Sequence, residues 1–306
     1  MKKFIYNLLI FVLPVWFVLT IVDLMFSSIA KRSNNYAIES WYDLMKGDIE
    51  ADVIIMGSSR AWVQYNPLIL DSILNINSYN LGIQGRHHHS EIKKYHLFNK
   101  RHNKKPRLIV QNIDIFELNA IDGGYNMYQF FPYFWERDMR REFINDEPLN
   151  AAEKYLPMYR FIHFGIRTFL PSDNKYLTKG FRGQITPWNG EAFMKVDSIR
   201  FVANDSVLRM FDTYLAEARA DGIKVLFVYA PIYIGATRKV TNIEQMYDTY
   251  QTFAKKYEIP ILDYSQMEIC YDTTYFYNAM HMNKLGAEVF SDSLATDIKR
   301  LGILKQ

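Results

Sequence analysis

The sequence predicts an α/β fold in which helices cover a mainly parallel β-sheet. From Asp52 onward, short apolar runs alternate with amphipathic stretches, which is the pattern of parallel strands connected by helices. Polar residues able to carry chemistry follow the apolar runs, where an α/β sheet places its ligands. An almost unbroken apolar stretch over residues 4–26 precedes this pattern and predicts a separate N-terminal helix.

The N-terminal stretch is long enough for a membrane anchor. About 20 apolar residues cross a bilayer, whereas a cleavable signal peptide has an apolar core of about 7 to 15 residues. The length of residues 4–26 favours a retained span, but Ser28-Ile29-Ala30 resembles a cleavage site, so a processed signal peptide is the alternative. Basic residues flank both ends, so the positive-inside rule leaves the orientation open. A cytoplasmic N-terminus with the rest of the chain outside is the simplest topology.

We expect three parts along the chain. These are an anchor over residues 1–30, a juxtamembrane linker over residues 31–50, and an α/β domain over residues 51–306. Within the domain, Asn66 followed by Pro67 indicates an N-cap and the first turn of a helix. The predicted elements are, in order, strand 53–56, helix 66–74, strand 78–81, helix 90–100, strand 108–113, helix 206–220, strand 225–229, helix 243–257, strand 259–263 and helix 286–298.

Residues 117–200 break this rhythm. The segment is rich in aromatic residues between Tyr125 and Trp135 and contains a glycine-rich piece over residues 179–183. One interpretation is a long insertion over the carboxyl edge of the sheet, where loops carry function. The other is a helical appendage with its own small core. The two are compatible.

Composition excludes several classes of function. The formal net charge is +3, too small to indicate a nucleic-acid partner. Cys270 is the only cysteine, so an intramolecular disulfide and a zinc site built on cysteines are both excluded. We expect no cofactor.

Two short segments point to nucleophilic catalysis. The run over residues 53–56 leads into Gly57-Ser58-Ser59, which places a hydroxyl on a tight turn at the carboxyl edge of the sheet. Near the other end of the chain, Asn278 and His281 lie on a loop that can reach this edge. The pattern predicts Ser59 as a nucleophile and His281 as its base. A strand-ending turn of small residues is the alternative reading of the first segment.

These segments resemble motifs of the SGNH/GDSL hydrolase superfamily. Gly57-Ser58-Ser59 looks like the Gly-Asp-Ser block, residues 278–281 look like the Asp-x-x-His block, and residues 82–85 resemble the block that donates an oxyanion N–H. The likeness covers most of the domain and implies a three-layer α/β/α fold. It implies that Ser59 attacks an ester carbonyl, that His281 transfers its proton, and that the N–H groups of Ser59 and Gly85 hold the oxyanion.

Two departures from the family pattern matter. Asn278 stands where the family usually carries Asp, so it orients the imidazole without adding a charge; Asp114, Asp263 or Asp272 are alternative sources of that charge, Asp114 first among them. The Gly-x-Asn-Asp block has no clear match, and Asn112 is the nearest candidate for its oxyanion donor. A catalytically silent protein therefore stays an alternative.

Two further features stay open. His87-His88-His89 follow the oxyanion turn, where a substrate-facing role is favoured over metal binding because no ligand set at suitable spacing supports them; we expect no metal site. Arg60, next to Ser59, is a candidate for binding an anionic group of the substrate.

A single anchor joined to an SGNH-like domain is similar to the partners of membrane-bound O-acyltransferases in alginate O-acetylation or teichoic acid D-alanylation. The resemblance implies a single-pass protein of the bacterial inner membrane, with an acyl transferase or esterase domain on the periplasmic side. Its partners would be an acylated polysaccharide or lipid-linked glycan, the bilayer through residues 4–26, and a multi-span O-acyltransferase. The aromatic segment would offer sugar rings a stacking surface. The alternative function is an inactive SGNH-fold protein that binds glycan or serves as a scaffold.

Overall fold

The structure is a computed structural model of the 306-residue chain. It describes residues 2–33, 35–84, 90–102, 104–118, 127–145, 149–171, 177–190 and 195–305. The described residues form two compact units: residues 1–42 with 126–176 make unit 1, and residues 43–125 with 177–306 make unit 2. Residues of the expected insertion at 117–200 therefore divide between the two units.

Unit 2 contains a five-stranded parallel sheet. Its strand order is β2-β1-β3-β4-β5, and every neighbouring pair is parallel. The chain moves from β1 outward to β2 and then returns to the other side of β1 for β3, so the order reverses between β1 and β3. Ligands of open α/β sheets bind outside the carboxyl ends of the strands at such a switch point. The strands are β1 (Val53–Met56), β2 (Ser78–Asn80), β3 (Leu108–Asn112), β4 (Lys224–Tyr229) and β5 (Ile261–Asp263).

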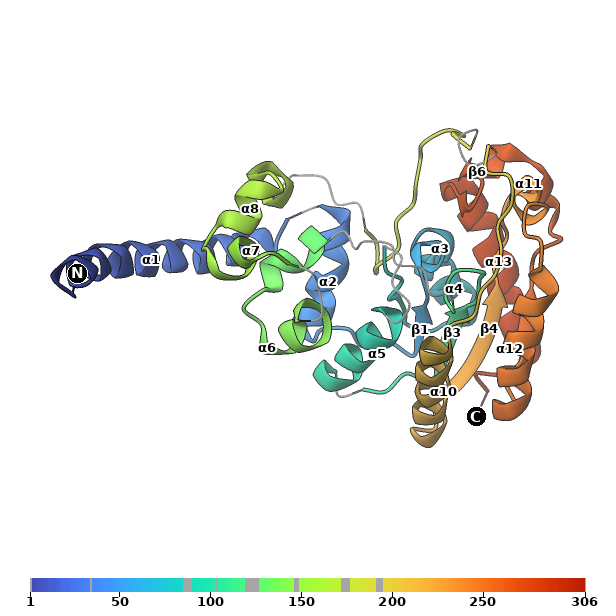
Figure 1. Cartoon of the computed structure of the whole chain (residues 1–306). Helices are drawn as coiled ribbons and strands as arrows, with labels where there is room; N and C mark the ends of the chain where they lie inside the picture. Colours follow the sequence, from blue (N-terminus) through green and yellow to red (C-terminus); the bar gives the residue numbers. More distant parts are fainter. Residues whose placement is uncertain are drawn as a thin grey trace. The chain divides into compact units, whose positions relative to one another are not determined.

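Helices cover both faces of the sheet, as Figure 1 shows. Successive side chains of a strand point to opposite faces, so β1 directs Val53 and Ile55 to one face and Ile54 to the other. The face of Val53 and Ile55 packs into one apolar core with α4 and α13. On the other face, Phe211 of α10 lies 5.9 Å from Phe227 of β4 between ring centroids. The three-layer α/β/α arrangement expected from the sequence is therefore present. The α-helices among the described residues of unit 2 are α3 (Ser59–Gln64), α4 (Pro67–Leu74), α5 (Ser90–Arg101), α10 (Asp205–Ala220), α11 (Ile234–Thr237), α12 (Ile243–Tyr257) and α13 (Lys284–Leu301).

The predicted boundaries agree closely with these elements, because their end signals are local. Asn66 caps α4 by accepting from Leu68 N, and Pro67 occupies the first turn. The loop expected around residues 278–281 is instead a short hairpin of β6 (Phe276–Asn278) and β7 (His281–Met282), preceded by the 3-10 helices η4 (Glu268–Tyr271) and η5 (Thr273–Tyr275).

Unit 1 is built on the N-terminal helix α1 (Lys2–Ala30). This helix is long and apolar enough to cross a membrane, by its length and composition. Short helical pieces of the 127–171 region pack with it. They are η1 (Met127–Tyr133), α6 (Arg137–Met139), η2 (Arg140–Ile144), α7 (Ala151–Tyr155), α8 (Tyr159–His163) and η3 (Ile166–Phe169), while α2 (Tyr36–Lys46) begins in this unit.

Most of the aromatic residues of the 127–135 segment form the interior of unit 1. Trp41 lies 5.2 Å from Phe130 between ring centroids, and its Nε1 donates to Gln129. Phe131, Tyr133 and Phe134 are also buried. The buried rings are therefore not free to stack on sugar rings, because α1 and α2 cover them in a way that no short-range sequence pattern reveals. Trp135 is 38% exposed and Tyr125 lies outside the described residues, so a stacking role for the segment stays a prediction.

Candidate active site

Ser59 lies at the carboxyl end of β1, at the switch point of the sheet. Strand β1 ends at Met56, and α3 begins at Ser59. Ser58 is the N-cap of α3, and its side chain accepts from Arg60 N. Ser58 Oγ donates to Asp114 Oδ2 at 3.0 Å, and Ser58 N donates to Glu117 Oε1 at 3.1 Å. These contacts fix the turn from both sides and leave the half-buried Ser59 side chain facing outward from the strand ends.

Gly57 is needed for this turn. Its φ is +140°, a conformation that side chains rarely adopt. A Cβ at this position would meet Asn112 Cβ at 2.8 Å, and both Ala61 Cβ and Glu117 Oε1 at 3.0 Å. The glycine therefore permits both the backbone conformation and the close approach of β3 and α3.

His281 lies on the β6–β7 hairpin. Two backbone N–H groups that donate to the Asn278 side chain hold the turn of this hairpin. Asn278 Oδ1 accepts from Met280 N and from His281 N, each at 3.0 Å. Because backbone N–H groups only donate, the atom facing them must be the amide oxygen rather than the nitrogen. The same Oδ1 lies 3.0 Å from His281 Nδ1, so Nδ1 must carry the proton and donate to it.

The structure brings Ser59, His281 and Asn278 together. Ser59 Oγ lies 2.8 Å from His281 Nε2. With Nδ1 protonated, Nε2 has a free lone pair and accepts the Ser59 hydroxyl proton. Tyr277 stacks on the imidazole, with ring centroids 5.5 Å apart and an interplanar angle of 14°. This is the geometry of a serine nucleophile with an oriented general base.

The environment of His281 favours its neutral form. Burial, followed by the positive charge of Arg60, lowers the pKa of His281 to about 3. Among the described residues, no carboxylate is hydrogen-bonded to His281, so no negative charge offsets these two effects.

Arg60 faces inward rather than toward a substrate. Its side chain is 2% exposed, donates to Ala230 O and lies over the ring of Tyr229. Its Nη1 is 3.8 Å from Asp114 Oδ2. The sequence-based candidate for an anionic subsite therefore acts inside the protein, as the positive charge of a buried network beneath the Ser59 turn.

Asp114 belongs to this network and does not contact His281. Its carboxylate accepts from Ser58 Oγ and from Phe116 N, at 3.0 and 2.7 Å. Asp263 and Asp272 accept from backbone N–H groups of their own loops. None of the three alternative acids is placed on the imidazole, and the residue that holds it is Asn278.

Asn112 is likewise engaged below the turn. Its Nδ2 donates to Glu117 Oε1 at 3.1 Å and to Asp114 Oδ2 at 3.4 Å, and its Oδ1 accepts from Tyr65. Both amide hydrogens are thus directed at carboxylates, and an oxyanion role would require Asn112 to give one of them up. The backbone N–H of Ser59, at the first position of α3, donates to no acceptor among the described residues and remains a candidate oxyanion donor. Gly85 lies outside the described residues.

Glu117 is a residue that the sequence reasoning missed. It bonds Ser58 N and Asn112, and it is buried. Burial and the nearby Glu91 and Asp114 carboxylates raise the pKa of Glu117 well above its usual range. Its loop position after β3 was the one available signal, because polar residues just past a strand end collect at this edge.

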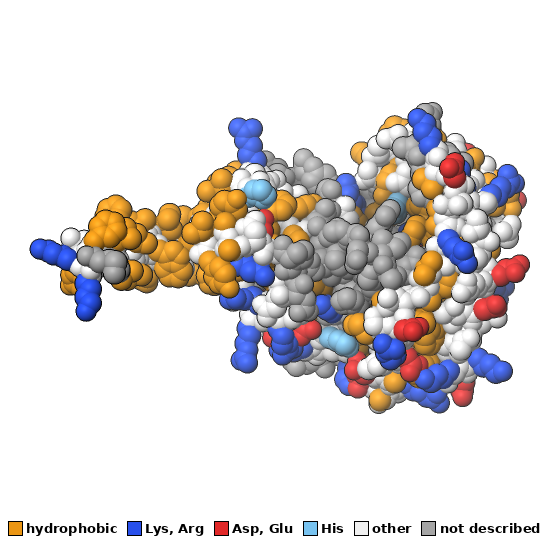
Figure 2. All heavy atoms as spheres, in the orientation of Figure 1, with side chains coloured by type: hydrophobic (Ala, Val, Ile, Leu, Met, Phe, Trp, Pro, Cys, Tyr) orange, Lys and Arg blue, Asp and Glu red, His pale blue; other side chains and the backbone are white. Residues whose placement is uncertain are grey.

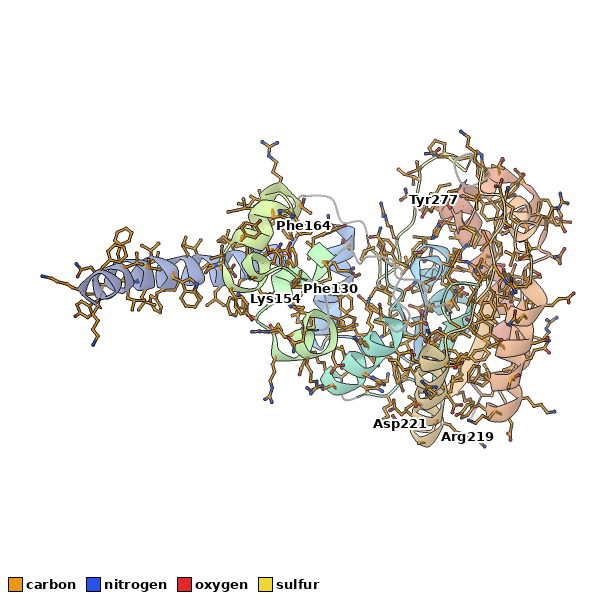
Figure 3. The ribbon with its side chains drawn as sticks, in the orientation of Figure 1. Phe130, Lys154, Phe164, Arg219, Asp221 and Tyr277 are labelled. Carbon is orange, nitrogen blue, oxygen red and sulfur yellow. The ribbon has the colours of Figure 1, made fainter. Side chains whose placement is uncertain are left out.

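Residues 177–190 cross the same edge of the sheet within unit 2. Asn80 N donates to Lys179 O, Arg182 N to Trp62 O, and Lys284 N to Gln184 O. Further along, Asn189 N donates to Tyr277 O at 2.7 Å. Trp188 packs edge to face on Tyr233, 5.1 Å between centroids. The segment is therefore joined to the ring that stacks on His281, because Asn189, the residue after the half-buried Trp188, donates to Tyr277. Tyr277 is labelled in Figure 3.

No site for a metal is evident in the described part of the chain. No group of three or more His, Cys, Asp or Glu side chains there is arranged to hold an ion. His87, His88 and His89 lie outside the described residues, so their predicted role beside the substrate stays a prediction. Cys270 is buried and free within the described structure.

Comparisons with known proteins give distant structural neighbours. No family model matches the chain, and no curated protein matches it. The structure is similar to that of a GDSL-like lipase from Bacteroides thetaiotaomicron, with 13% identity, a TM-score of 0.40, and 88% of this chain and 98% of that chain covered. It is also similar to a proposed lipolytic protein of the G-D-S-L family from Desulfitobacterium hafniense, with 11% identity, a TM-score of 0.40, and coverage of 81% and 99%. A proposed acylhydrolase from Bacteroides fragilis has 12% identity, a TM-score of 0.39, and coverage of 83% and 89%. Because these likenesses are so distant, the chemistry must be inferred from the side chains of this chain.

Proposed function

We propose that this chain is a serine esterase or acyl transferase with Ser59 as its nucleophile. The observation that carries the proposal is the chain of contacts from Ser59 Oγ to His281 Nε2 at 2.8 Å, and from His281 Nδ1 to Asn278 Oδ1 at 3.0 Å. The chain of contacts lies at the switch point of a parallel sheet, the usual ligand position of such folds.

The reaction proceeds in two transfers. Ser59 Oγ attacks the carbonyl carbon of an ester while its proton moves to His281 Nε2, and the Ser59 N–H donates to the developing oxyanion. Collapse breaks the bond to the leaving alcohol, which takes the proton from Nε2. Water or an acceptor hydroxyl then gives its proton to Nε2 and attacks the acyl-serine. When this second intermediate collapses, the bond between the acyl carbon and Ser59 Oγ breaks, and Oγ takes the proton back from Nε2.

The proposal extends to a membrane-anchored enzyme on the periplasmic side of a bacterial inner membrane. Its substrates would be O-acyl groups of an envelope polysaccharide or glycolipid, and its partner a multi-span O-acyltransferase. The length and composition of α1 support the anchor. The half-buried Trp188 beside Tyr233 supports a sugar acceptor, because aromatic faces stack on sugar rings.

A specific observation favours the silent alternative. No carboxylate of the described residues contacts His281, whose lowered pKa makes it a weak base. A protein of this kind would bind an acylated glycan at the same edge without turning it over.

The deciding experiment is active-site labelling of the full chain in detergent. We expect a fluorophosphonate probe to label the parent protein and to fail with Ser59→Ala. Ser293→Ala is the matched control, because within the described structure this hydroxyl bonds only a carbonyl of its own helix, α13. Peptide mapping that finds the adduct on another residue, or labelling that persists in Ser59→Ala, would remove the nucleophile assignment. The absence of labelling in the folded parent would favour the silent alternative.

Transfer and hydrolysis are separated by single-turnover kinetics. We expect an oligosaccharide acceptor to speed the loss of the acyl group from Ser59, and Trp188→Ala to reduce that acceleration without preventing acylation. Tyr271→Ala, an exposed ring on η4, is the control. If added sugar changes neither the rate nor the product, the protein is an esterase.

A further inference from the structure

Unit 1 carries an apolar groove beside α1. Its volume is about 350 Å³, and it contains almost no polar surface. One wall belongs to α1 and the other to the segment around α8. The lining residues are Phe11, Val12, Val15, Trp16, Leu19, Leu156, Pro157, Tyr159 and Ile162.

A buried polar cluster holds the second wall against the helix. Asp23 of α1 is fully buried and forms an ion pair with Arg160 of α8. The same carboxylate accepts from Trp135 Nε1 at 2.7 Å and from Met158 N at 2.6 Å. A charge within an apolar helix is costly unless it is paired, so this cluster fixes where the α8 segment meets α1.

The exposed side chains of residues 155–170 are mainly apolar, and His163 and Arg167 are the exposed polar ones. Two of the groove-lining residues, Leu156 and Ile162, are 52% and 62% exposed, and Phe164, outside the lining, is exposed as well. Figure 3 shows Phe164 on the α8 segment, and Figure 2 shows the hydrophobic side chains that cover α1 on the visible face. The exposed apolar side chains of α1 and of residues 155–170 belong to the same unit, and a large exposed apolar surface indicates that a partner covers it. The additional exposed apolar residues of the segment are Tyr155, Ile166 and Leu170.

The position along α1 identifies that partner as lipid. The hydrocarbon core of a bilayer takes about 20 residues of helix, and α1 has 29 residues. The groove is lined by α1 residues between Phe11 and Leu19, in the middle of the helix. Whatever surrounds this part of α1 therefore also fills the groove. Trp16 Nε1 donates to Tyr155 O, so a backbone carbonyl that lipid could not satisfy has a protein partner.

We infer that residues 155–170 form a second membrane-embedded element, which lies in the bilayer beside α1 and takes a lipid acyl chain in the groove between them. This inference rests on the bilayer placement of α1 that belongs to the proposed function, and it is independent of the chemistry at Ser59. The protein then holds the membrane by a span and by an embedded segment of the same unit.

Site-specific fluorescence quenching tests the inference on the full chain in phosphatidylcholine vesicles. Because Cys270 is the only cysteine, Cys270→Ser provides a background without thiols. Ile162→Cys and Leu156→Cys, each labelled with a polarity-sensitive dye, report the embedded segment. Val18→Cys, exposed on α1 outside the groove lining, is the reference for a lipid-facing site. Leu68→Cys, similarly exposed on α4 of unit 2, is the matched control.

We expect nitroxide-labelled lipids to quench the dyes at Ile162 and Leu156 by a fraction comparable with that at Val18, and to leave Leu68 almost unquenched. Iodide in the water should show the reverse order. Quenching at Ile162 and Leu156 that matches Leu68 overturns the inference while α1 keeps its span. If nitroxide lipids fail to quench the dye at Val18 as well, the bilayer placements of both α1 and residues 155–170 are overturned. Fluorophosphonate labelling of Ser59 in the same vesicles scores the chemistry separately, and circular dichroism checks that each variant is folded.

Discussion

Asn278 determines how strong a base His281 is. The amide already sets the tautomer, because Oδ1 accepts from Nδ1–H and two backbone donors fix its orientation. It adds no charge, and the imidazole stays neutral next to Arg60. In serine proteases, replacing the triad Asp by Asn lowers turnover by about four orders of magnitude, partly because the imidazole then adopts the wrong tautomer. Here that part of the loss is avoided.

We therefore expect Asn278→Asp to raise ester turnover by about tenfold or more, since each unit of pKa gained by the imidazole adds about 1.4 kcal/mol to the stability of its protonated form. The new Oδ1 keeps all three donors, and Asn278 Nδ2 has no partner to lose within the described structure. Steady-state kcat/KM on a short-chain ester is the measurement. A folded Asn278→Asp variant with no activity would show that Asn278 has another role.

The pH dependence of activity follows from the same histidine. The acid limb of kcat/KM reports the pKa of the free enzyme's base. Because the pKa of His281 is lowered to about 3, we expect the limb to lie well below pH 6.5. Asn278→Asp should move it upward. A parent profile that falls with a midpoint near 6.5 would contradict the lowered pKa of the half-buried imidazole.

The lowered pKa of His281 should also make the stability of the protein depend on pH. The unfolded chain binds a proton on His281 as the pH falls through 6.5, whereas the native chain does so only near 3. The free energy of unfolding therefore decreases as the pH falls from about 6.5 to about 3. Urea denaturation at several pH values should show a weaker decrease for His281→Gln than for the parent.

At the scale of elements, the β1–α3 turn depends on Gly57. We expect Gly57→Ala to destabilise the protein by about 1–3 kcal/mol through backbone strain and to abolish probe labelling of Ser59, because the turn must move away from Asn112 and Glu117. Gly222→Ala is the matched control: its φ is also positive, but an added Cβ meets nothing within 4 Å. Equal labelling of the two variants would show that the turn tolerates a side chain.

The Asp23–Arg160 pair should hold unit 1 together. Both side chains are buried, so removing one partner leaves the other charge unpaired, at a cost of about 3–5 kcal/mol. We expect Arg160→Met to make the 127–171 region sensitive to protease in detergent, and Arg167→Met, an exposed arginine of the same unit, to leave it resistant. The double variant Asp23→Asn with Arg160→Met should recover part of the resistance, because no charge is then left unpaired.

How far the sequence predicts these elements depends on whether their signals are local. The apolar runs and the Asn66-Pro67 cap lie within a few residues of the elements they define. The strands, the helices and the carboxyl edge of the sheet could therefore be predicted from them. The position of Ser59 followed from the same reasoning, since it comes just after a strand at that edge. His281 was expected on a loop and instead begins β7 of the hairpin. The partners of Asn112 and Arg60 depend on contacts between distant segments, such as Arg60 with Ala230, and no spacing in the sequence indicates them.

At the scale of the whole molecule, the residues of α1 belong to two environments. Its first two-thirds are exposed and apolar, as a membrane span requires. Its end is part of the interior of unit 1: Ala30 is fully buried, and Phe26 packs on Phe161 with ring centroids 4.8 Å apart. Sequence reasoning could find the span but not this interior role, because the buried partners lie more than a hundred residues away.

This interior role bears on whether the N-terminal segment is cleaved. Processing after Ala30 would remove Asp23 and leave Arg160 buried without its partner, together with the unpaired donors of Trp135 and Met158. Buried donors left without acceptors each cost about 1–3 kcal/mol, and the unpaired charge costs more. We therefore expect the protein purified from membranes to retain residues 1–30. Mass spectrometry of the protein expressed with its own N-terminus is the measurement, with a C-terminal tag so that either form is captured. A mass lower by residues 1–30, in a protein whose 127–171 region still resists protease, would show that unit 1 folds without α1.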